Sequence, residues 1–130
     1  MIVLDASAAV DWLLQTSAGQ NIDKRIFSCN ETLHAPQLLD LEVLQVLRRL
    51  ALQGVVSVRR ADEAVRDLLD LRITRYPHFV LLPRIWQLRH DSSSYDAAYI
   101  VLAEKLGAAL ITRDARLAST SGHAAFVELF

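Results

Sequence analysis

The chain has 130 residues, of which 52% are hydrophobic, and its 14 basic and 15 acidic side chains leave a formal net charge of −1. This length and apolar content predict one domain over residues 1–130 with a buried core, and they exclude intrinsic disorder. The charge balance excludes the overall basic footprint of a tight nucleic-acid binder, so any polyanion must be bound locally.

The first apolar run is too short to be a signal peptide or a membrane span. It covers residues 1–4 and ends at Asp5, with no basic region before it and no small-residue cleavage site after it. We therefore expect a cytoplasmic protein that binds no membrane.

Short apolar runs alternate with longer helical patterns, which is typical of βαβ units and a parallel sheet. Pro36 and Pro77 lack a backbone donor and predict strand exits. We expect a three-layer α/β/α fold with a central, mainly parallel sheet. In chain order, the expected elements are strand 2–4, helices 6–14 and 19–29, strand 33–35, helices 37–52 and 59–71, strand 73–76, helices 83–89 and 95–106, and strands 109–112 and 126–129.

Two serines predict the starts of helices. Ser57 is a possible N-cap of the helix over 59–71, and Ser93, three residues before Asp96, forms the pattern of a capping box. Glycines mark two helix ends, at Gly54 and Gly107.

The cysteine and the histidines form no metal-binding pattern. Cys29 is the only cysteine, so it can form no internal disulfide, and we expect it to be a small core residue. The histidines share no metal-ligand spacing, which argues against a zinc site and predicts loop or surface positions for all of them. They are His34, His78, His90 and His123.

Four acidic residues are placed where an α/β fold would bring them together. Asp5 follows the first expected strand, and Asp114 follows the fourth. In an open α/β sheet the ligand crevice lies beyond the carboxyl ends of the strands, so these two should face each other. Asp96 lies in the first turn of its helix, and Glu42 borders the apolar face of another.

Carboxylates drawn within a few ångströms of one another would repel, and one would take up a proton unless a cation were present. Oxygen ligands favour Mg²⁺ or Mn²⁺ over zinc. Such a cluster can activate water and neutralise a phosphoryl group during phosphodiester hydrolysis. Ser7 and Thr112 lie two residues from Asp5 and Asp114, where their hydroxyls could support the site, or could serve only as a helix cap and as strand filling.

Each acid also has a purely structural alternative. Asp5 could cap the helix that follows it, Asp96 could belong to a capping box, and Asp114 could cap a short turn at 115–118. Glu42 could be a boundary residue on a solvated helix. Asp91 could be a fifth acid at the rim or a solvated loop residue.

The candidates for nucleic-acid contacts are arginines and tryptophans. Arg113 and Arg116 bracket Asp114, and guanidinium groups suit phosphate oxygens. Trp12 and Trp86 could stack on bases, or pack in the core or in an interface.

The chain also carries more amphipathic surface than one small sheet can cover. The helices over 19–29 and 59–71 and the apolar run over 12–14 contribute to it. An exposed patch of that kind indicates an interface, and we expect a homodimer.

Four segments together resemble the successive motifs of PIN-domain ribonucleases, and most closely those of the VapC toxins of bacterial toxin–antitoxin pairs. The resemblance covers essentially the whole chain in the right order. The segments are Val3-Leu4-Asp5-Ala6-Ser7-Ala8, the helix that holds Glu42, Ser94-Tyr95-Asp96-Ala97-Ala98-Tyr99, and Leu110-Ile111-Thr112-Arg113-Asp114-Ala115-Arg116-Leu117. One departure is Ser92, where related toxins usually carry an apolar residue.

The resemblance implies a single PIN domain that hydrolyses RNA phosphodiester bonds with Mg²⁺ or Mn²⁺. It also implies a homodimer and a small inhibitory antitoxin of the VapB type. The acidic site that it implies, both catalytic and metal-binding, comprises Asp5, Glu42, Asp96 and Asp114.

Other classes of protein remain as alternatives. A PIN-like nuclease of RNA processing outside a toxin–antitoxin pair would share these residues. A non-catalytic interaction domain would lack an acid, whereas all four are present. A phosphatase of the haloacid dehalogenase type also has an Asp after its first strand, but it needs a second Asp two residues on, where this chain has Ser7.

Overall fold

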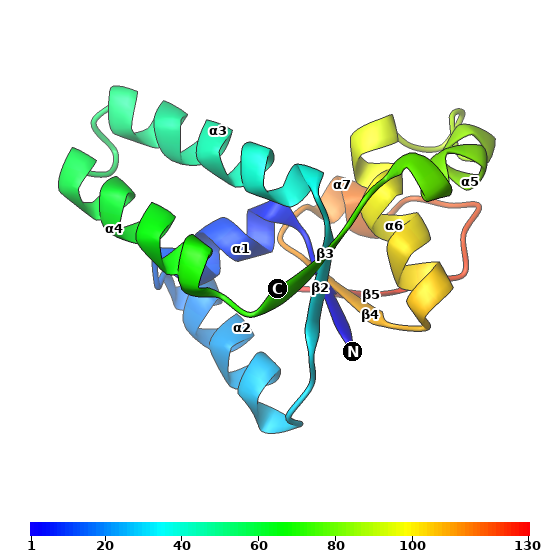
Figure 1. Ribbon diagram of the computed structural model, residues 1–130, viewed down its shortest axis with the longest axis horizontal. Helices are drawn as coiled ribbons and strands as arrows, with labels where there is room; N and C mark the ends of the chain where they lie inside the picture. The colour runs from blue at the N-terminus through cyan, green and yellow to red at the C-terminus, as the bar shows by residue number, and fades with distance from the viewer.

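The computed structural model describes residues 1–130 and has one five-stranded sheet at its centre (Figure 1). Its order is β3-β2-β1-β4-β5, and every neighbouring pair is parallel. The strands are β1 (Ile2–Leu4), β2 (Leu33–Pro36), β3 (Ile73–Tyr76), β4 (Ala109–Thr112) and β5 (Phe126–Leu129). The expected strands are confirmed, and the sheet is parallel throughout.

Helices cover both faces of the sheet. They are α1 (Ala6–Leu13), α2 (Ser17–Ser28), α3 (Leu38–Leu52), α4 (Val58–Asp70), the 3₁₀ turn η1 (Phe79–Leu81), α5 (Leu82–Gln87), α6 (Ser94–Leu106) and α7 (Ala115–Ala118). Helices α1 to α4 lie on one side and α5 and α6 on the other, which confirms the three layers (Figure 1). None of these helices combines the length and apolar character needed to cross a membrane.

Strand β1 is the centre of the sheet and fixes the position of the acidic residues. All three of its side chains are fully buried, as expected for a strand covered by helices on both faces. Leu4 at its end is in register with Ile111 of β4. The segments that leave these two strands therefore begin side by side.

The helix starts follow the expected capping chemistry. The Ser57 hydroxyl accepts a hydrogen bond from the backbone N–H of Arg60 at 3.1 Å, and the Ser93 hydroxyl accepts one from Asp96 at 3.1 Å. Gly107 ends α6 with a φ of +59°, which a glycine adopts without strain. The segment over 115–118, expected as a turn, is a one-turn helix.

Two expectations about single residues were wrong. Cys29 is exposed because it lies at the end of α2, outside the apolar face of that helix. His34 is buried in β2, where its ring nitrogens pair with the Thr32 hydroxyl at 2.8 Å and the Tyr76 hydroxyl at 2.9 Å. A histidine whose two nitrogens both have partners can be buried at low cost.

The two tryptophans have different environments. Trp12 and Leu13 are buried where α1 meets α2, and the Trp12 indole N–H donates to Asp23 at 2.7 Å. These residues therefore do not contribute the exposed apolar surface that we expected of them. Trp86 is 67% exposed, and the guanidinium of Arg89 lies 4.9 Å from its ring centre.

Candidate active site

Asp5 leaves the end of β1 and is buried, with 4% of its surface exposed. Its Oδ1 accepts hydrogen bonds from the Ser7 hydroxyl at 2.7 Å and from the backbone N–H of Ala8 at 2.8 Å, so Asp5 is the N-cap of α1. Its Oδ2 accepts from the Thr112 hydroxyl at 2.5 Å. Burial raises the pKa of Asp5, and these hydrogen bonds oppose the rise.

Ser7 and Thr112 connect Asp5 to the end of β4. The Ser7 hydroxyl accepts from the backbone N–H of Arg113 at 2.9 Å, and the Thr112 hydroxyl accepts from the backbone N–H of Asp114 at 2.9 Å. Each hydroxyl therefore donates to Asp5 and accepts from the chain that leaves β4. Together they fix the distance between the Asp5 carboxylate and the backbone of Asp114.

Asp114 caps α7 with one oxygen and faces a guanidinium with the other. Its Oδ1 accepts from the backbone N–H groups of Arg116 at 2.8 Å and Leu117 at 3.4 Å. Its Oδ2 lies 3.5 Å from Arg116, whose guanidinium also lies 3.9 Å from Asp96. The Arg116 side chain is 83% exposed, and ion pairs of such exposed groups contribute at most about 1 kcal/mol. Arg116 can therefore leave these carboxylates at little cost.

Glu42, on α3, has a strongly raised pKa. Burial first, and then the charges of Asp96 and Asp5, raise its pKa from 4.5 to about 7. Its Oε1 is buried without a hydrogen bond, and so is the hydroxyl of Tyr99 on α6. The Tyr99 hydroxyl partly offsets the rise in the Glu42 pKa, so these two groups are neighbours even though they form no hydrogen bond of regular geometry.

The four acids share one region without forming a tight cluster. Asp114 contributes to the raised pKa of Asp5, just as Asp5 and Asp96 contribute to that of Glu42. However, no three Asp, Glu, His or Cys side chains stand close enough together to hold a metal ion. The carboxylates lie further apart than we expected, because Asp5 is turned toward its hydrogen-bond donors and Arg116 contacts both Asp96 and Asp114.

Arg113 lies beside the acids in the sequence but makes other contacts. Its Nε donates to Asp11 at 2.7 Å, and its guanidinium also donates to the backbone carbonyl of Phe130. These bonds tie α1 to the C-terminus. Of the two arginines that bracket Asp114, only Arg116 has its guanidinium against the acids.

Sequence reasoning missed Tyr99 and the groove beside Asp96. Tyr99 lies three residues after Asp96, a spacing that puts two side chains on one side of a helix and could have pointed to it. The groove holds about 600 Å³ and is lined by residues 89–93 and 119–121 with Asp96 and Arg116. We call it the polar groove, because none of its lining residues is hydrophobic.

Comparison with known proteins agrees with this geometry. The model of the PIN domain family matches residues 2–122. The chain belongs to the PIN-domain family. Ribonuclease VapC12 of Mycobacterium tuberculosis is 42% identical over 129 residues, which are 99% of this chain and 98% of that protein. Ribonuclease VapC9 of the same species is 41% identical over 120 residues, which are 92% of this chain and 91% of that protein.

Two solved structures share this fold. VapC20 of Mycobacterium tuberculosis, described as a toxin that cleaves the sarcin-ricin loop, superposes with a TM-score of 0.67 at 19% identity, over 95% of this chain and 97% of that one. PAE2754 of Pyrobaculum aerophilum superposes with a TM-score of 0.69 at 26% identity, over 97% of this chain and 82% of that one. The resemblance to VapC proteins and the PIN fold are thus both confirmed.

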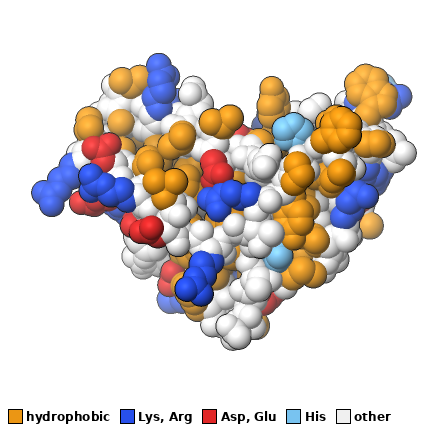
Figure 2. Space-filling view, viewed as in Figure 1, with side chains coloured by type: hydrophobic (Ala, Val, Ile, Leu, Met, Phe, Trp, Pro, Cys, Tyr) orange, Lys and Arg blue, Asp and Glu red, His pale blue; other side chains and the backbone are white.

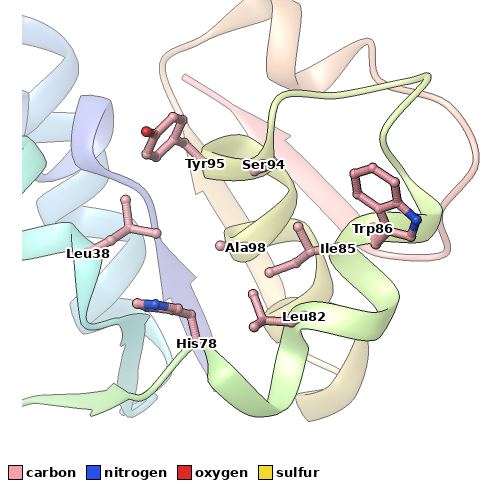
Figure 3. Close-up of a pocket in the computed structure, with 8 residues that line it drawn as sticks. All are labelled: Leu38, His78, Leu82, Ile85, Trp86, Ser94, Tyr95 and Ala98. Carbon is pink, nitrogen blue, oxygen red and sulfur yellow. The ribbon is translucent and has the colours of Figure 1, made fainter.

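This PIN domain also has an apolar pocket beside α6, near the residues that follow β2 and β3. Figure 3 shows it between α5, the start of α6 and the start of α3, with Tyr95, His78 and Trp86 at its edges. It holds about 320 Å³, and none of the four acids lines it. The pocket is therefore separate from the acidic site. Its lining residues are Leu38, His78, Leu82, Ile85, Trp86, Ser94, Tyr95 and Ala98.

Proposed function

We propose that this chain is a divalent-metal-dependent endoribonuclease and the toxin of a VapBC-type toxin–antitoxin pair. The observation that carries the proposal is the meeting of Asp5, Glu42, Asp96 and Asp114 at the carboxyl edge of a parallel sheet, in a chain similar over its length to proteins named ribonuclease VapC.

The same four residues would hold Mg²⁺ or Mn²⁺ once their side chains draw closer together, since no three of them stand within metal-binding distance in the free protein. They offer only carboxylate oxygens, which are the donors that these cations prefer. Glu42 Oε1 is buried with no hydrogen-bond partner, so it is an acceptor in need of a positive partner. When bound, such a cation would supply an activated water and neutralise negative charge on the phosphoryl group.

The chain's own groups would position the substrate and a proton. Ser7 and Thr112 hold the Asp5 carboxylate in one orientation. Arg116 would exchange its weak contacts with Asp96 and Asp114 for a phosphate oxygen of the RNA. Glu42, whose pKa is about 7 in the metal-free protein, would give up its proton when the cation binds.

Cleavage of an end-labelled RNA by the purified chain tests the proposal. We expect internal cuts with Mg²⁺ or Mn²⁺, loss of cleavage in EDTA, and recovery when the cation is added back in excess. DNA of the same sequence is the matched control substrate. Undiminished cleavage in EDTA would contradict the metal-dependent mechanism, and the absence of internal cuts under all conditions would contradict the nuclease.

The partners that we propose are an RNA substrate, a second copy of the chain and a VapB-type antitoxin. Hydrophobic side chains gather on the side of the molecule formed by α5 and α6 (Figure 2). Trp86 and Tyr95, which are 67% and 69% exposed, line the apolar pocket (Figure 3), and Phe79 of η1 is 77% exposed. An exposed apolar patch of this kind indicates an interface, and we assign it to the homodimer.

Trp86→Asp should therefore convert a dimer into a monomer in sedimentation experiments across protein concentrations. Leu52→Asp, at an apolar residue at the end of α3 that is 72% exposed, is the control and should leave the dimer intact. Expression of the chain alone should slow growth, and co-expression with the small protein encoded next to it should restore growth. A stable wild-type monomer that is harmless in cells would contradict both proposals.

A further inference from the structure

The polar groove adjoins the acidic site, because Asp96 and Arg116 are among its lining residues. Its two lining segments, residues 89–93 and 119–121, are joined by a hydrogen bond from the Ser121 hydroxyl to Asp91 Oδ1 at 3.2 Å. Gly122 is fitted to this contact, because its φ is +81° and a Cβ there would lie 2.9 Å from Asp91 Oδ2.

The size and position of the groove suit one unit of a nucleic-acid chain. Its 600 Å³ lies within the range of about 300–1,000 Å³ that is usual for small-molecule sites. Because the groove is this small, a strand that passes Asp96 can place only a short segment inside it. The segment would adjoin the phosphate that Arg116 is proposed to hold.

The groove carries no excess of positive charge, because its arginines, Arg89 and Arg116, are balanced by Asp91 and Asp96. Away from Arg116, the groove must therefore select its occupant mainly by hydrogen bonding.

Most hydroxyl groups in the groove donate their hydrogen bonds to other groups of the protein. Ser119 and Thr120 donate to the backbone carbonyl of Arg116 at 2.9 and 3.3 Å, and Ser92 donates to the carbonyl of Ser93 at 3.2 Å. Ser121 donates to Asp91, as described above. The lone pairs of these oxygens remain free, so the groove presents acceptors to whatever enters it.

The exposed carboxylate of Asp91 is the strongest of these acceptors, because only its Oδ1 has a partner. A ribose 2′-hydroxyl can donate to such a group, and a deoxyribose has no hydroxyl there. A wall of acceptors next to a scissile phosphate would thus distinguish RNA from DNA.

We propose that the polar groove binds one ribonucleotide next to the scissile phosphate, with Asp91 accepting a hydrogen bond from its ribose 2′-hydroxyl. This inference rests on the proposed ribonuclease function and gives the site a specificity-determining residue outside the four acids.

A scan of 2′-deoxy substitutions tests the inference. A short RNA substrate is prepared with a single deoxyribose at each position in turn, and kcat/KM is measured for each. Binding is measured by anisotropy on matched RNAs that carry a non-hydrolysable phosphonate at the cleavage position. For the wild type we expect one flanking position where the deoxy substitution weakens binding about tenfold, the effect of one hydrogen bond to a charged group.

Asp91→Ala should weaken binding of the all-ribose RNA by a similar factor and should remove the sensitivity at that one position. Asp91→Asn keeps the shape of the side chain and the Ser121 contact, and it should show an intermediate loss of binding. It replaces Asp91→Ala as the test if that variant does not fold. Asp62→Ala, at an exposed carboxylate on α4, is the matched control and should retain the wild-type pattern.

The outcomes separate this inference from the proposed function. A wild type that cleaves RNA but tolerates deoxyribose at every flanking position overturns the groove assignment alone. Equal losses for ribose and deoxyribose substrates in Asp91→Ala overturn it as well, because they place the effect elsewhere. A wild type that neither binds nor cleaves any RNA overturns the proposed function and, with it, the inference.

Discussion

Asp96→Asn is expected to lose RNA cleavage by at least about 10²-fold while the protein remains folded. The substitution keeps the size of the side chain and removes one of the charges that would bind the cation. The backbone N–H of Asp96 donates to the Ser93 hydroxyl, and this cap does not depend on the carboxylate. Asp96 is therefore a cleaner test than Asp5, whose carboxylate is buried and also caps α1.

The same variant should be slightly more stable than the wild type in metal-free buffer, and more so at high pH. Because the folded Glu42 pKa of about 7 exceeds 4.5, ionising Glu42 destabilises the fold. This penalty is absent well below pH 4.5 and complete above about pH 7. Asp96 contributes to it, so removing its charge should add about 0.5–1 kcal/mol above pH 7, after allowance for solvent screening, and little at pH 4.

Cleavage rates and thermal unfolding at pH 4 and pH 8 measure the two effects together. Asp62→Asn is the matched control, since it removes an exposed carboxylate on α4 far from the acids. If Asp96→Asn cleaves RNA at the wild-type rate, Asp96 is not part of the catalytic site. If the variant is inactive and also unfolds at a lower temperature, the loss of cleavage comes from a destabilised fold instead.

The arrangement of the sheet was predictable because its strands are short apolar runs with clear ends. Pro36 closes β2, and Asp5 directly follows β1. Neighbouring parallel strands end at the same edge, so the expectation that Asp5 and Asp114 lie near each other required only that β1 and β4 be neighbours, as they are. Signals of this kind depend only on residues close together in the sequence, so tertiary contacts do not change what they predict.

The environment of single residues was less predictable because it depends on tertiary partners. His34 is buried since Thr32 and Tyr76 satisfy its ring, and Tyr76 lies on a different strand. Arg113 turns to Asp11 and to the last residue of the chain rather than to the adjacent Asp114. The spacing of residues in the sequence does not predict these contacts of His34 and Arg113.

For Asp114, the structural alternative does not exclude the functional one. Asp5 and Asp114 are both N-caps, as the simpler interpretation required. The cap of α7 uses only Oδ1 of Asp114, which leaves Oδ2 facing Arg116. A capping role therefore holds a carboxylate in one orientation at the strand end without using all of its oxygens.

Gly19→Ala is expected to destabilise the protein by about 2–3 kcal/mol, although alanine is the better helix former. A Cβ at Gly19 would lie 1.9 Å from the backbone oxygen of Asp11 and 2.6 Å from its carbonyl carbon. These are backbone atoms of α1, so no side chain can move aside to relieve the clash. The gain in helix propensity of about 1 kcal/mol is too small to offset it.

The helix that moves in response should be α2. Helix α1 is held by the Asp5 cap at one end and by the Arg113–Asp11 pair at the other, and it also packs against α3 and β4. Helix α2 has one strong tie to the sheet, from Arg25 to Glu128 at 2.9 Å. At temperatures where the variant is folded, the acidic site should therefore keep its geometry and RNA cleavage should remain near the wild-type rate.

Thermal and urea unfolding of Gly19→Ala, with Gln20→Ala as the control at an exposed neighbour on α2, measure the destabilisation. A loss of 2–3 kcal/mol corresponds to a fall in Tm of about 5–12 °C for a domain of this size. An unchanged Tm would mean that α1 and α2 can separate without cost. A variant that is folded at the assay temperature yet inactive would instead show that α1 moves rather than α2. The position of the Asp5 cap would then depend on the close contact at Gly19.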